Sequence, residues 1–294
     1  MIAGSTPEWS SWFPLLGISR NSSVPRLPGI YRVRRRDFDR LDYIGQTGRS
    51  LRERLGALSR CHAEQMPYRD PHTAAPALWA LRDATGCEFE ASFVAVAGDS
   101  HTRKGQEALA IGLYRQESGA SPTAQFGRIP DGYRASSANN SRLVAAGARF
   151  RGGLYDGPPL AEHCAGAPPV GPLTPNTQSQ SWCGHGWSPW IALSDVRFTI
   201  PANTVGLYRI RGDCNDTLLY VGQGVLPNRP LAHLTKIAKV DHVQGEMFAA
   251  QRRLEVSWVA APQRPANQLL ELENDIIAAH VLHLNSAPAA QFKG

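Results

Sequence analysis

The stretch PGIYRVRRRDFDRLDYIGQ (residues 28–46) sets the expected fold, because a second stretch of the chain, VGLYRIRGDCNDTLLYVGQ (205–223), matches it. In each stretch two short runs with apolar residues flank a polar segment, and eleven residues separate the two tyrosines. Short apolar or alternating runs joined by a polar turn are typical of a β-hairpin. We therefore expect the same antiparallel hairpin at two places in the chain.

The similarity extends well beyond the two hairpins. The further matched landmarks are WSSW (9–12) with WSPW (187–190), EASFV (90–94) with EVSWV (255–259), and PTAQF (122–126) with PAAQF (288–292). In both cases a glutamate precedes the glutamine of the last landmark by eighteen residues. Landmarks that recur in one order indicate a tandem duplication, with one copy at about 9–126 and the other at about 187–292.

The duplication defines the expected domain organisation. We predict a first module at 1–126, a Pro/Gly-rich linker at 127–186 and a second module at 187–294. The first part of the linker, residues 133–153, carries four arginines. This part suits a contact with the DNA backbone as well as a solvated loop, and the sequence leaves both open.

Each copy has the pattern of an α+β unit. A third strand is expected at 87–97 in the first copy and at 254–261 in the second. Amphipathic patterns predict helices at 50–60, 76–84 and 103–115 in the first copy, and at 230–240, 244–253 and 267–282 in the second. We therefore predict, in each copy, a three-stranded antiparallel sheet with helices packed on it.

Composition narrows the possible functions. The chain of 294 residues carries a net charge of +6, and residues 26–60 alone hold ten arginines against four acidic residues. Such a segment suits a polyanion, although a solvated basic face is the alternative. The sequence has no apolar run of membrane-spanning length and no secretory pattern at its start, so we expect a cytoplasmic protein with no membrane partner.

The cysteines do not indicate a disulfide framework or a zinc site. The five cysteines are scattered, without a CxxC pair, so we expect free thiols. Zinc binding by His163, Cys164, Cys183 and His185 is disfavoured, because neither half has the usual pair spacing.

Four polar residue types recur in both copies at positions that suit a core poorly. They are Tyr31 and Tyr208, Tyr43 and Tyr220, Arg54 and Arg229, and Glu107 and Glu273. Each has an ordinary structural explanation when taken alone, since tyrosines are common in strands and arginines on wet helix faces. Together they are the parts that phosphodiester hydrolysis needs: a carboxylate for a divalent metal, an arginine for developing charge, and a hydroxyl to orient water. A lone carboxylate suits Mg²⁺, which keeps most of its waters.

These residues carry a resemblance to a known family. Gly29-Ile30-Tyr31 with Tyr43-Ile44-Gly45 resembles the signature of the GIY-YIG nuclease family, and Gly206-Leu207-Tyr208 with Tyr220-Val221-Gly222 resembles a second, varied instance. The resemblance implies an α+β module with a central antiparallel sheet, and Mg²⁺-dependent (or Mn²⁺-dependent) cleavage of DNA. It covers roughly three quarters of the chain.

The resemblance implies a role for individual residues. The implied catalytic residues are Tyr31, Tyr43, Arg54 and Glu107 in the first copy, and Tyr208, Tyr220, Arg229, His233 and Glu273 in the second. Glu107 and Glu273 are the implied metal ligands, with Gln125 and Gln291 in support, and Arg34, Arg36, Arg49 and Arg52 are expected to contact DNA. The segment LRERL favours Arg54 over Arg52, and the spacing to the terminal glutamine favours Glu273 over Glu271.

The sequence also departs from the family pattern. Leu58 of the first copy stands where the second copy has His233. The first copy therefore lacks the family's histidine, unless His62, one turn further along, takes its place. Gln125 and Gln291 stand where relatives often have asparagine, and Gln46 and Gln223 follow the second motif where some have lysine. The first copy could therefore be slower, or act mainly in DNA binding.

We thus expect an Mg²⁺-dependent DNA endonuclease whose two sites act as a monomeric pseudo-dimer on duplex DNA, in a restriction-like, repair-like or mobile-element role. The alternative is a DNA-binding protein in which one or both modules have lost catalysis. Cleavage of RNA is a third, less favoured possibility.

Overall fold

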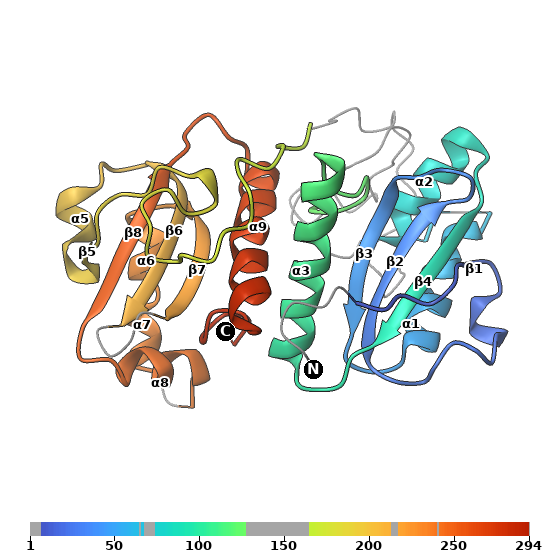
Figure 1. Cartoon of the computed structure of the whole chain (residues 1–294), viewed down its shortest axis with the longest axis horizontal. Coiled ribbons are helices and arrows are strands. Elements are labelled where there is room, and N and C mark those ends of the chain that lie inside the picture. Colours follow the sequence, from blue (N-terminus) through green and yellow to red (C-terminus); the bar gives the residue numbers. More distant parts are fainter. Residues whose placement is uncertain are drawn as a thin grey trace. The chain divides into compact units, whose positions relative to one another are not determined.

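The computed structural model describes residues 7–64, 66–67, 74–127, 165–212, 217–239 and 241–293. Contacts divide the chain into two compact units, each built around one antiparallel sheet (Figure 1). The N-terminal unit contains the described residues of 7–99 and 121–166, and the C-terminal unit contains those of 100–120 and 167–293. Residues 100–120 thus group with the second sheet, although they belong to the first predicted module.

The sheet of the N-terminal unit has the strand order β1-β4-β2-β3. Its strands are β1 (Phe13–Pro14), β2 (Gly29–Arg35), β3 (Leu41–Thr47) and β4 (Phe89–Ala95). Two helices, α1 (Leu51–Leu58) and α2 (Ala75–Thr85), pack on the face that carries Tyr31 and Val33, and 3-10 turns lie at Ile18–Arg20 and Ser59–His62. The Ser50 hydroxyl accepts a hydrogen bond from the Glu53 N–H and caps the first turn of α1.

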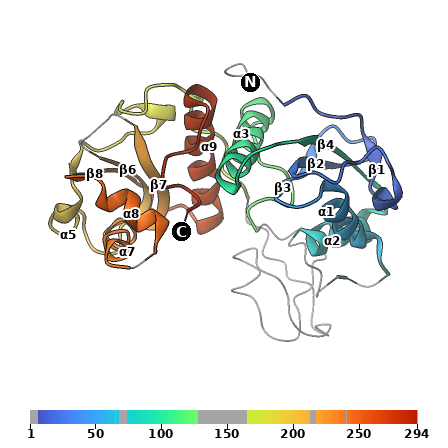
Figure 2. The ribbon, with the colours of Figure 1, turned by 90° about the horizontal axis from the view of Figure 1, so that it is seen from below.

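The sheet of the C-terminal unit has the equivalent order β5-β8-β6-β7. Its strands are β5 (Ile191–Ala192), β6 (Val205–Gly212), β7 (Leu218–Val225) and β8 (Leu254–Ala260). The helices are α3 (Ser100–Ser118), α5 (Val196–Thr199), α6 (Asn228–Leu231), α7 (Leu234–Ile237), α8 (Val243–Ala249) and α9 (Ala266–Leu284), with 3-10 turns at Trp182–Gly184 and Leu193–Asp195. Figure 2 shows α7 and α8 on one side of this sheet and α9 beside β7.

The prediction of mixed helices and antiparallel strands is confirmed, but each sheet has four strands, not three. The additional strands, β1 and β5, are two residues long and pair with β4 and β8. Strands this short show no periodicity, so the sequence pattern could not reveal them. The single helix predicted at 230–240 is in fact two short helices, α6 and α7.

The repeated WSxW segments cover arginines of the sheets. The Arg32 guanidinium lies 4.6 Å from the ring centre of Trp9 and 4.7 Å from that of Trp12. The Arg209 guanidinium lies 4.4 Å from Trp187 and 4.7 Å from Trp190. Burial lowers the pKa of Arg209 to about 9. Cation–π contacts therefore account for both WSxW segments as structural motifs.

Part of the predicted linker is packed into the C-terminal unit. Ala167, Trp182 and Cys183 are buried in the core that also contains Trp187. The Trp182 indole N–H donates to the Thr174 carbonyl. The predicted DNA contact at 133–153 lies outside the described residues, as do His163 and Cys164.

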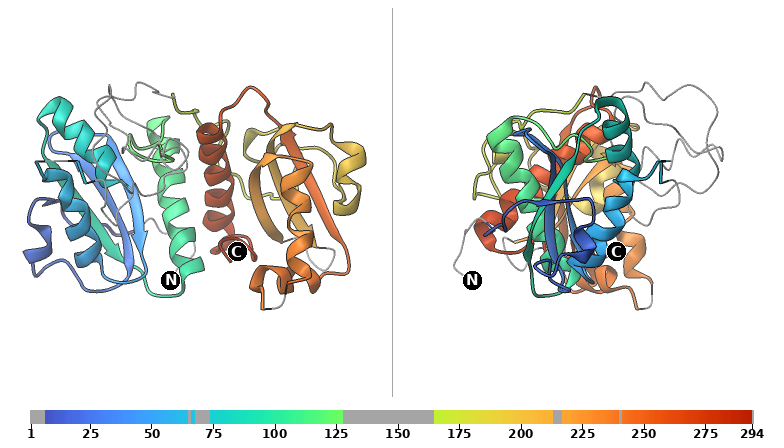
Figure 3. Two further views of the ribbon diagram at one scale, coloured as in Figure 1. Left: turned by 180° about the vertical axis from the view of Figure 1, so that it is seen from behind. Right: turned by 90° about the vertical axis from the view of Figure 1, so that its right-hand side faces the viewer.

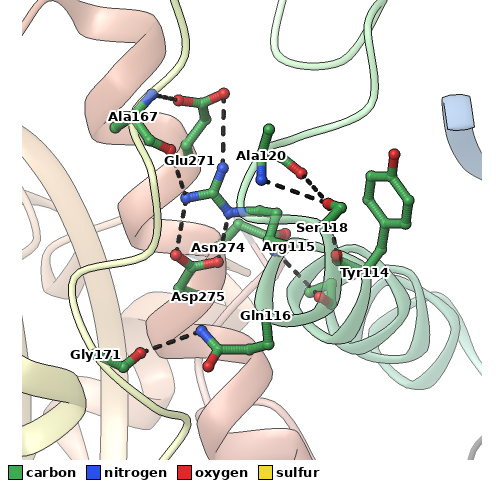
Figure 4. A network of polar contacts seen from close by, with 11 residues as sticks. Tyr114, Arg115, Gln116, Ser118, Ala120, Ala167, Gly171, Glu271, Asn274 and Asp275 are labelled. Atoms are coloured by element: carbon green, nitrogen blue, oxygen red, sulfur yellow. Dashed lines mark hydrogen bonds and ion pairs between the residues drawn. The ribbon is translucent and has the colours of Figure 1, made fainter. Parts of the chain in front are cut away.

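Helices α3 and α9 run side by side within the C-terminal unit (Figure 3). A Cβ on Gly112 would come 2.3 Å from the Cβ of Ala278, so the small residues allow a close approach. The fully buried Arg115 donates two hydrogen bonds to the Asp275 carboxylate, at 2.7 and 2.9 Å, and one to the Ala167 carbonyl (Figure 4). The Glu271 carboxylate lies 3.7 Å from Arg115. A buried cation is thus fully paired, as burial requires.

Glycines of the two hairpins lie where a side chain has no room. Tyr208 of β6 pairs with Gly222 of β7, and a Cβ on Gly222 would come 2.5 Å from the Tyr208 hydroxyl oxygen and ring. Tyr31 and Gly45 repeat this arrangement in the N-terminal unit, also at 2.5 Å. The glycine of each second motif is therefore explained by an aromatic ring that lies over its Cα.

We expect Gly222→Ala to lower the free energy of unfolding by about 1–3 kcal/mol, because the added methyl group forces the Tyr208 ring or the strand to move. Urea unfolding followed by circular dichroism measures the change. The matched control is Gly186→Ala, where nothing lies within 4 Å of the added Cβ. Equal stability of the two variants would contradict the close contact.

Candidate active site

The two tyrosines of the second copy lie on one face of the C-terminal sheet. Tyr208 pairs with Gly222, and Tyr220 pairs with Ile210, so strand alternation puts both side chains on the same side. Their ring centres are 6.0 Å apart and the rings are stacked. Tyr208 is 1% exposed and Tyr220 is half-buried. The tyrosine pair thus has one buried member and one that reaches toward solvent.

His233 completes this cluster from the turn between α6 and α7. Its Nε2 atom is hydrogen-bonded to the Tyr208 hydroxyl at 2.9 Å, and its ring centre is 4.3 Å from that of Tyr220. The ring centre of Phe248, on α8, lies 5.1 Å from that of His233. Within the described residues, Nδ1 has no hydrogen-bond partner at close range, although the nearby Gln244 side chain acts to raise the imidazole pKa.

Burial sets the protonation states of the cluster. Burial, assisted by the positive charge of Lys236, lowers the pKa of His233 to about 4. Burial also raises the pKa of Tyr208 well above 10 and that of Tyr220 to about 12. At neutral pH the imidazole is therefore an uncharged proton acceptor beside protonated hydroxyls.

Arg229 and Glu273 act on the same cluster from two other elements. Arg229 of α6 is exposed, and its side chain runs along Gly224, where an added Cβ would lie 3.0 Å from the Arg229 Cγ. Glu273 of α9 is partly buried, and burial raises its pKa to about 8 while Arg229 opposes the rise. The Glu273 carboxyl also raises the pKa of both tyrosines, which places it near them.

The rival carboxylate, Glu271, has a structural role. It lies near Arg115 and accepts a hydrogen bond from the Ala167 N–H. Glu273, by contrast, makes no hydrogen bond or close ion pair within the part of the chain that the structure describes. A buried carboxyl of this kind favours a positively charged ligand, and the donor chemistry of Glu273 fits a divalent cation that keeps most of its waters. Among the described residues no cluster of three or more metal-binding side chains is found, so neither Cys183 with His185 nor Glu273 belongs to one.

The two glutamines predicted to support the sites are buried and hydrogen-bond the edge strands of the two sheets. Gln291 Oε1 accepts a hydrogen bond of 3.0 Å from the Val221 N–H, next to Tyr220 on the edge strand β7. Gln125 Oε1 accepts one of 3.1 Å from the Ile44 N–H of β3. These glutamines thus fix the strand that carries the second tyrosine.

The equivalent region of the N-terminal unit is more apolar. The ring centres of Tyr31 and Tyr43 are 6.2 Å apart, but Leu58 stands at the histidine position and is fully buried. His62 faces elsewhere: its Nε2 lies 3.2 Å from the Glu88 carboxylate. Arg54, on α1, is partly buried. The remaining member, Glu107, lies on α3 and belongs to the C-terminal unit.

Two of the four arginines expected to contact DNA are engaged within the N-terminal unit. Arg34 forms an ion pair of 2.6 Å with Glu90, and Arg52 donates to the carbonyls of Val24 and Ser22. Arg36 and Arg49 are exposed. Sequence reasoning missed Lys236 and Gln244 beside His233. Lys236 follows the histidine by three residues on one helix face, which was a usable signal, whereas Gln244 gave none.

Comparisons of the chain with models of protein families, with curated proteins and with solved structures found no match. Among the described helices, none combines the length and the apolar character needed to span a bilayer.

We expect Glu273→Gln to stabilise the protein at about pH 8.5 by about 1–3 kcal/mol, and to have little effect near pH 5. The unfolded carboxyl ionises near its ordinary pKa of 4.5 and the folded one near 8, so the wild type loses stability as the pH rises between these values. Glutamine does not ionise and avoids this loss. Urea unfolding at the two pH values measures the difference.

The control for this prediction is Glu246→Gln, an exposed glutamate of α8. We expect it to change stability equally at both pH values. A Glu273→Gln variant whose stability relative to wild type does not depend on pH would contradict a buried, protonated Glu273.

Proposed function

We propose that the chain is a divalent-metal-dependent DNA endonuclease of the GIY-YIG type, built from two copies of one module, with its better-formed active site in the C-terminal unit. The observation that carries the proposal is the Tyr208–His233 hydrogen bond of 2.9 Å beside Tyr220. Both sheets also share one strand order and one tyrosine–glycine pairing, which supports a duplication.

In this proposal each residue of the cluster has a separate role in phosphodiester hydrolysis. Glu273 would hold Mg²⁺ or Mn²⁺, which supplies charge neutralisation at the scissile phosphate and a more acidic water. The exposed Arg229 guanidinium offsets the negative charge that develops on the phosphate. A tyrosine hydroxyl orients the attacking water.

His233 accounts for the proton that the attack releases. A tyrosine with a pKa well above 10 stays protonated at neutral pH, so by itself it cannot take a proton from water. The neutral imidazole accepts the proton of the Tyr208 hydroxyl at Nε2 while that hydroxyl takes one from water. The low pKa of His233, about 4, keeps the acceptor unprotonated at neutral pH.

The N-terminal unit would supply the second site of a pseudo-dimer that cuts both strands of a duplex in a restriction-like or repair-like role. One observation favours an alternative for this copy, which is DNA binding without cutting. Leu58 is fully buried where the C-terminal unit has its histidine, so the side chain at this position offers no proton acceptor.

The proposal is tested by incubating the protein with supercoiled plasmid at low salt, with Mg²⁺ and with EDTA. We expect cutting only with Mg²⁺, and a loss of at least about 100-fold in the rate of linear-product formation for Glu273→Gln and for His233→Leu. Linear product without nicked circles indicates paired sites, and nicked circles alone indicate that one unit cuts. Full cutting by Glu273→Gln would refute the assigned site.

The matched control is again Glu246→Gln, for which we expect the wild-type rate. Comparison of Glu273→Gln with Glu107→Gln, which changes the matching glutamate of the first copy, assigns the active copy. If only the first variant loses activity, the N-terminal copy does not cut.

A further inference from the structure

Three cations gather at helices α6 and α7, next to His233. Arg229 and Lys239 are exposed and Lys236 is partly buried. The ion pairs in the described part of the C-terminal unit involve Arg115, Arg211 and Arg253, but none of these three residues. Glu273 acts on Arg229 only at longer range. The three like charges are therefore held together without a neutralising carboxylate on Lys236 or Lys239.

The position of Lys236 is fixed by a neutral partner. The Lys236 ammonium donates a close hydrogen bond to Oε1 of Gln244. Gln244 is 1% exposed, and its Nε2 donates a hydrogen bond of 2.7 Å to the Ala290 carbonyl. A Cβ on Gly245 would come 2.2 Å from the Lys236 carbonyl oxygen, so α8 lies directly against α7. An amide orders the lysine without cancelling its charge, whereas a carboxylate would cancel it.

The cations lie close enough to one another and to His233 to act on each other electrostatically. Burial lowers the pKa of Lys236, and the charges of Arg229 and Lys239 lower it further. Lys236 and Arg229 both lower the pKa of His233. Residues three apart share a helix face, which agrees with Lys236 lying beside His233.

The N-terminal unit shows that the fold itself does not require a cation at the position of Lys236. Leu58 and Cys61 follow Arg54 at the spacing at which His233 and Lys236 follow Arg229. Both are fully buried in the apolar core of that unit. The lysine and the histidine at these two positions are thus specific to the C-terminal unit and are not required by the shared fold.

We propose that Lys236, ordered by Gln244 and flanked by Arg229 and Lys239, binds a backbone phosphate of DNA next to the one that is cleaved. This inference rests on the proposed function for the identity of its ligand. A fixed ammonium without a neutralising partner suits a phosphate oxygen, and three neighbouring cations suit more than one phosphate of a strand. The lysine would therefore set where the strand lies relative to His233.

The test measures binding of a short fluorescein-labelled DNA duplex by fluorescence anisotropy, in EDTA, over a salt range of about 50–200 mM. Glu273→Gln is the background, so that no cutting interferes. We expect Lys236→Gln to weaken binding about 3–10-fold near 100 mM salt and to reduce the slope of log K against log salt by about 0.9. Lys236→Arg keeps the charge and is expected to keep the slope.

The control is Arg264→Gln, which removes the same charge from a side chain that contacts Gln268 at the start of α9. We expect its slope to equal that of the background protein. Equal slopes for Lys236→Gln and Arg264→Gln would overturn the inference, because net charge alone would then explain binding. Thermal unfolding of each variant establishes that it is folded.

The outcomes separate this inference from the proposed function. Binding that depends on Lys236, in a wild-type protein that does not cut plasmid with Mg²⁺, supports the phosphate site and refutes the nuclease. If the wild type cuts plasmid but Lys236→Gln has no effect on binding, the nuclease is supported and the phosphate site is refuted. Absence of both binding and cutting refutes both.

Discussion

The packing of a tyrosine ring over a glycine Cα is the constraint on which the candidate site depends. In the C-terminal unit the Tyr208 ring fills the space that a side chain at position 222 would occupy, which fixes the pairing of β6 with β7. The ring is held so that its hydroxyl reaches Nε2 of His233. Because Tyr31 and Gly45 pack in the same way, the constraint belongs to the hairpin and not to the chemistry of one site.

What differs between the two units is the polarity of the helices that cover this face. In the C-terminal unit His233 is hydrogen-bonded to Tyr208, Lys236 and Gln244 lie near His233, and burial leaves the imidazole uncharged. Around Tyr31 stand Leu58 and Cys61 in an apolar core. The same backbone fold thus carries polar residues at these positions in the C-terminal unit and apolar residues at the equivalent positions in the N-terminal unit. This contrast within one chain is the main physical argument that the polar residues of the C-terminal unit serve a ligand.

The second buried polar system, centred on Arg115, has a different role. Its guanidinium is paired with Asp275 and Glu271 and joins α3 to α9, the helix that carries Glu273. A buried cation that lost one of these partners would be strongly unfavourable, so the network specifies one arrangement of the two helices. The same network explains why Glu271 is engaged while Glu273, two residues later, remains available.

The sequence by itself determined the hairpins, their tyrosine and glycine positions and the long helices, because local periodicity and a repeated spacing encode these features. The assignment of Glu273 as a metal ligand stays a prediction. The sequence also placed Arg229 and His233 at the start of the helical segment after β7. Only the tertiary structure decided the fourth strands, the division of 230–240 into α6 and α7, the packing of α3 on α9, and the contact of Lys236 with Gln244. Two-residue strands have no period, and Gln244 meets Lys236 and Ala290 only because separate elements pack together. Contacts between distant residues leave no local pattern in the sequence, and this is why the elements could be predicted while their packing could not.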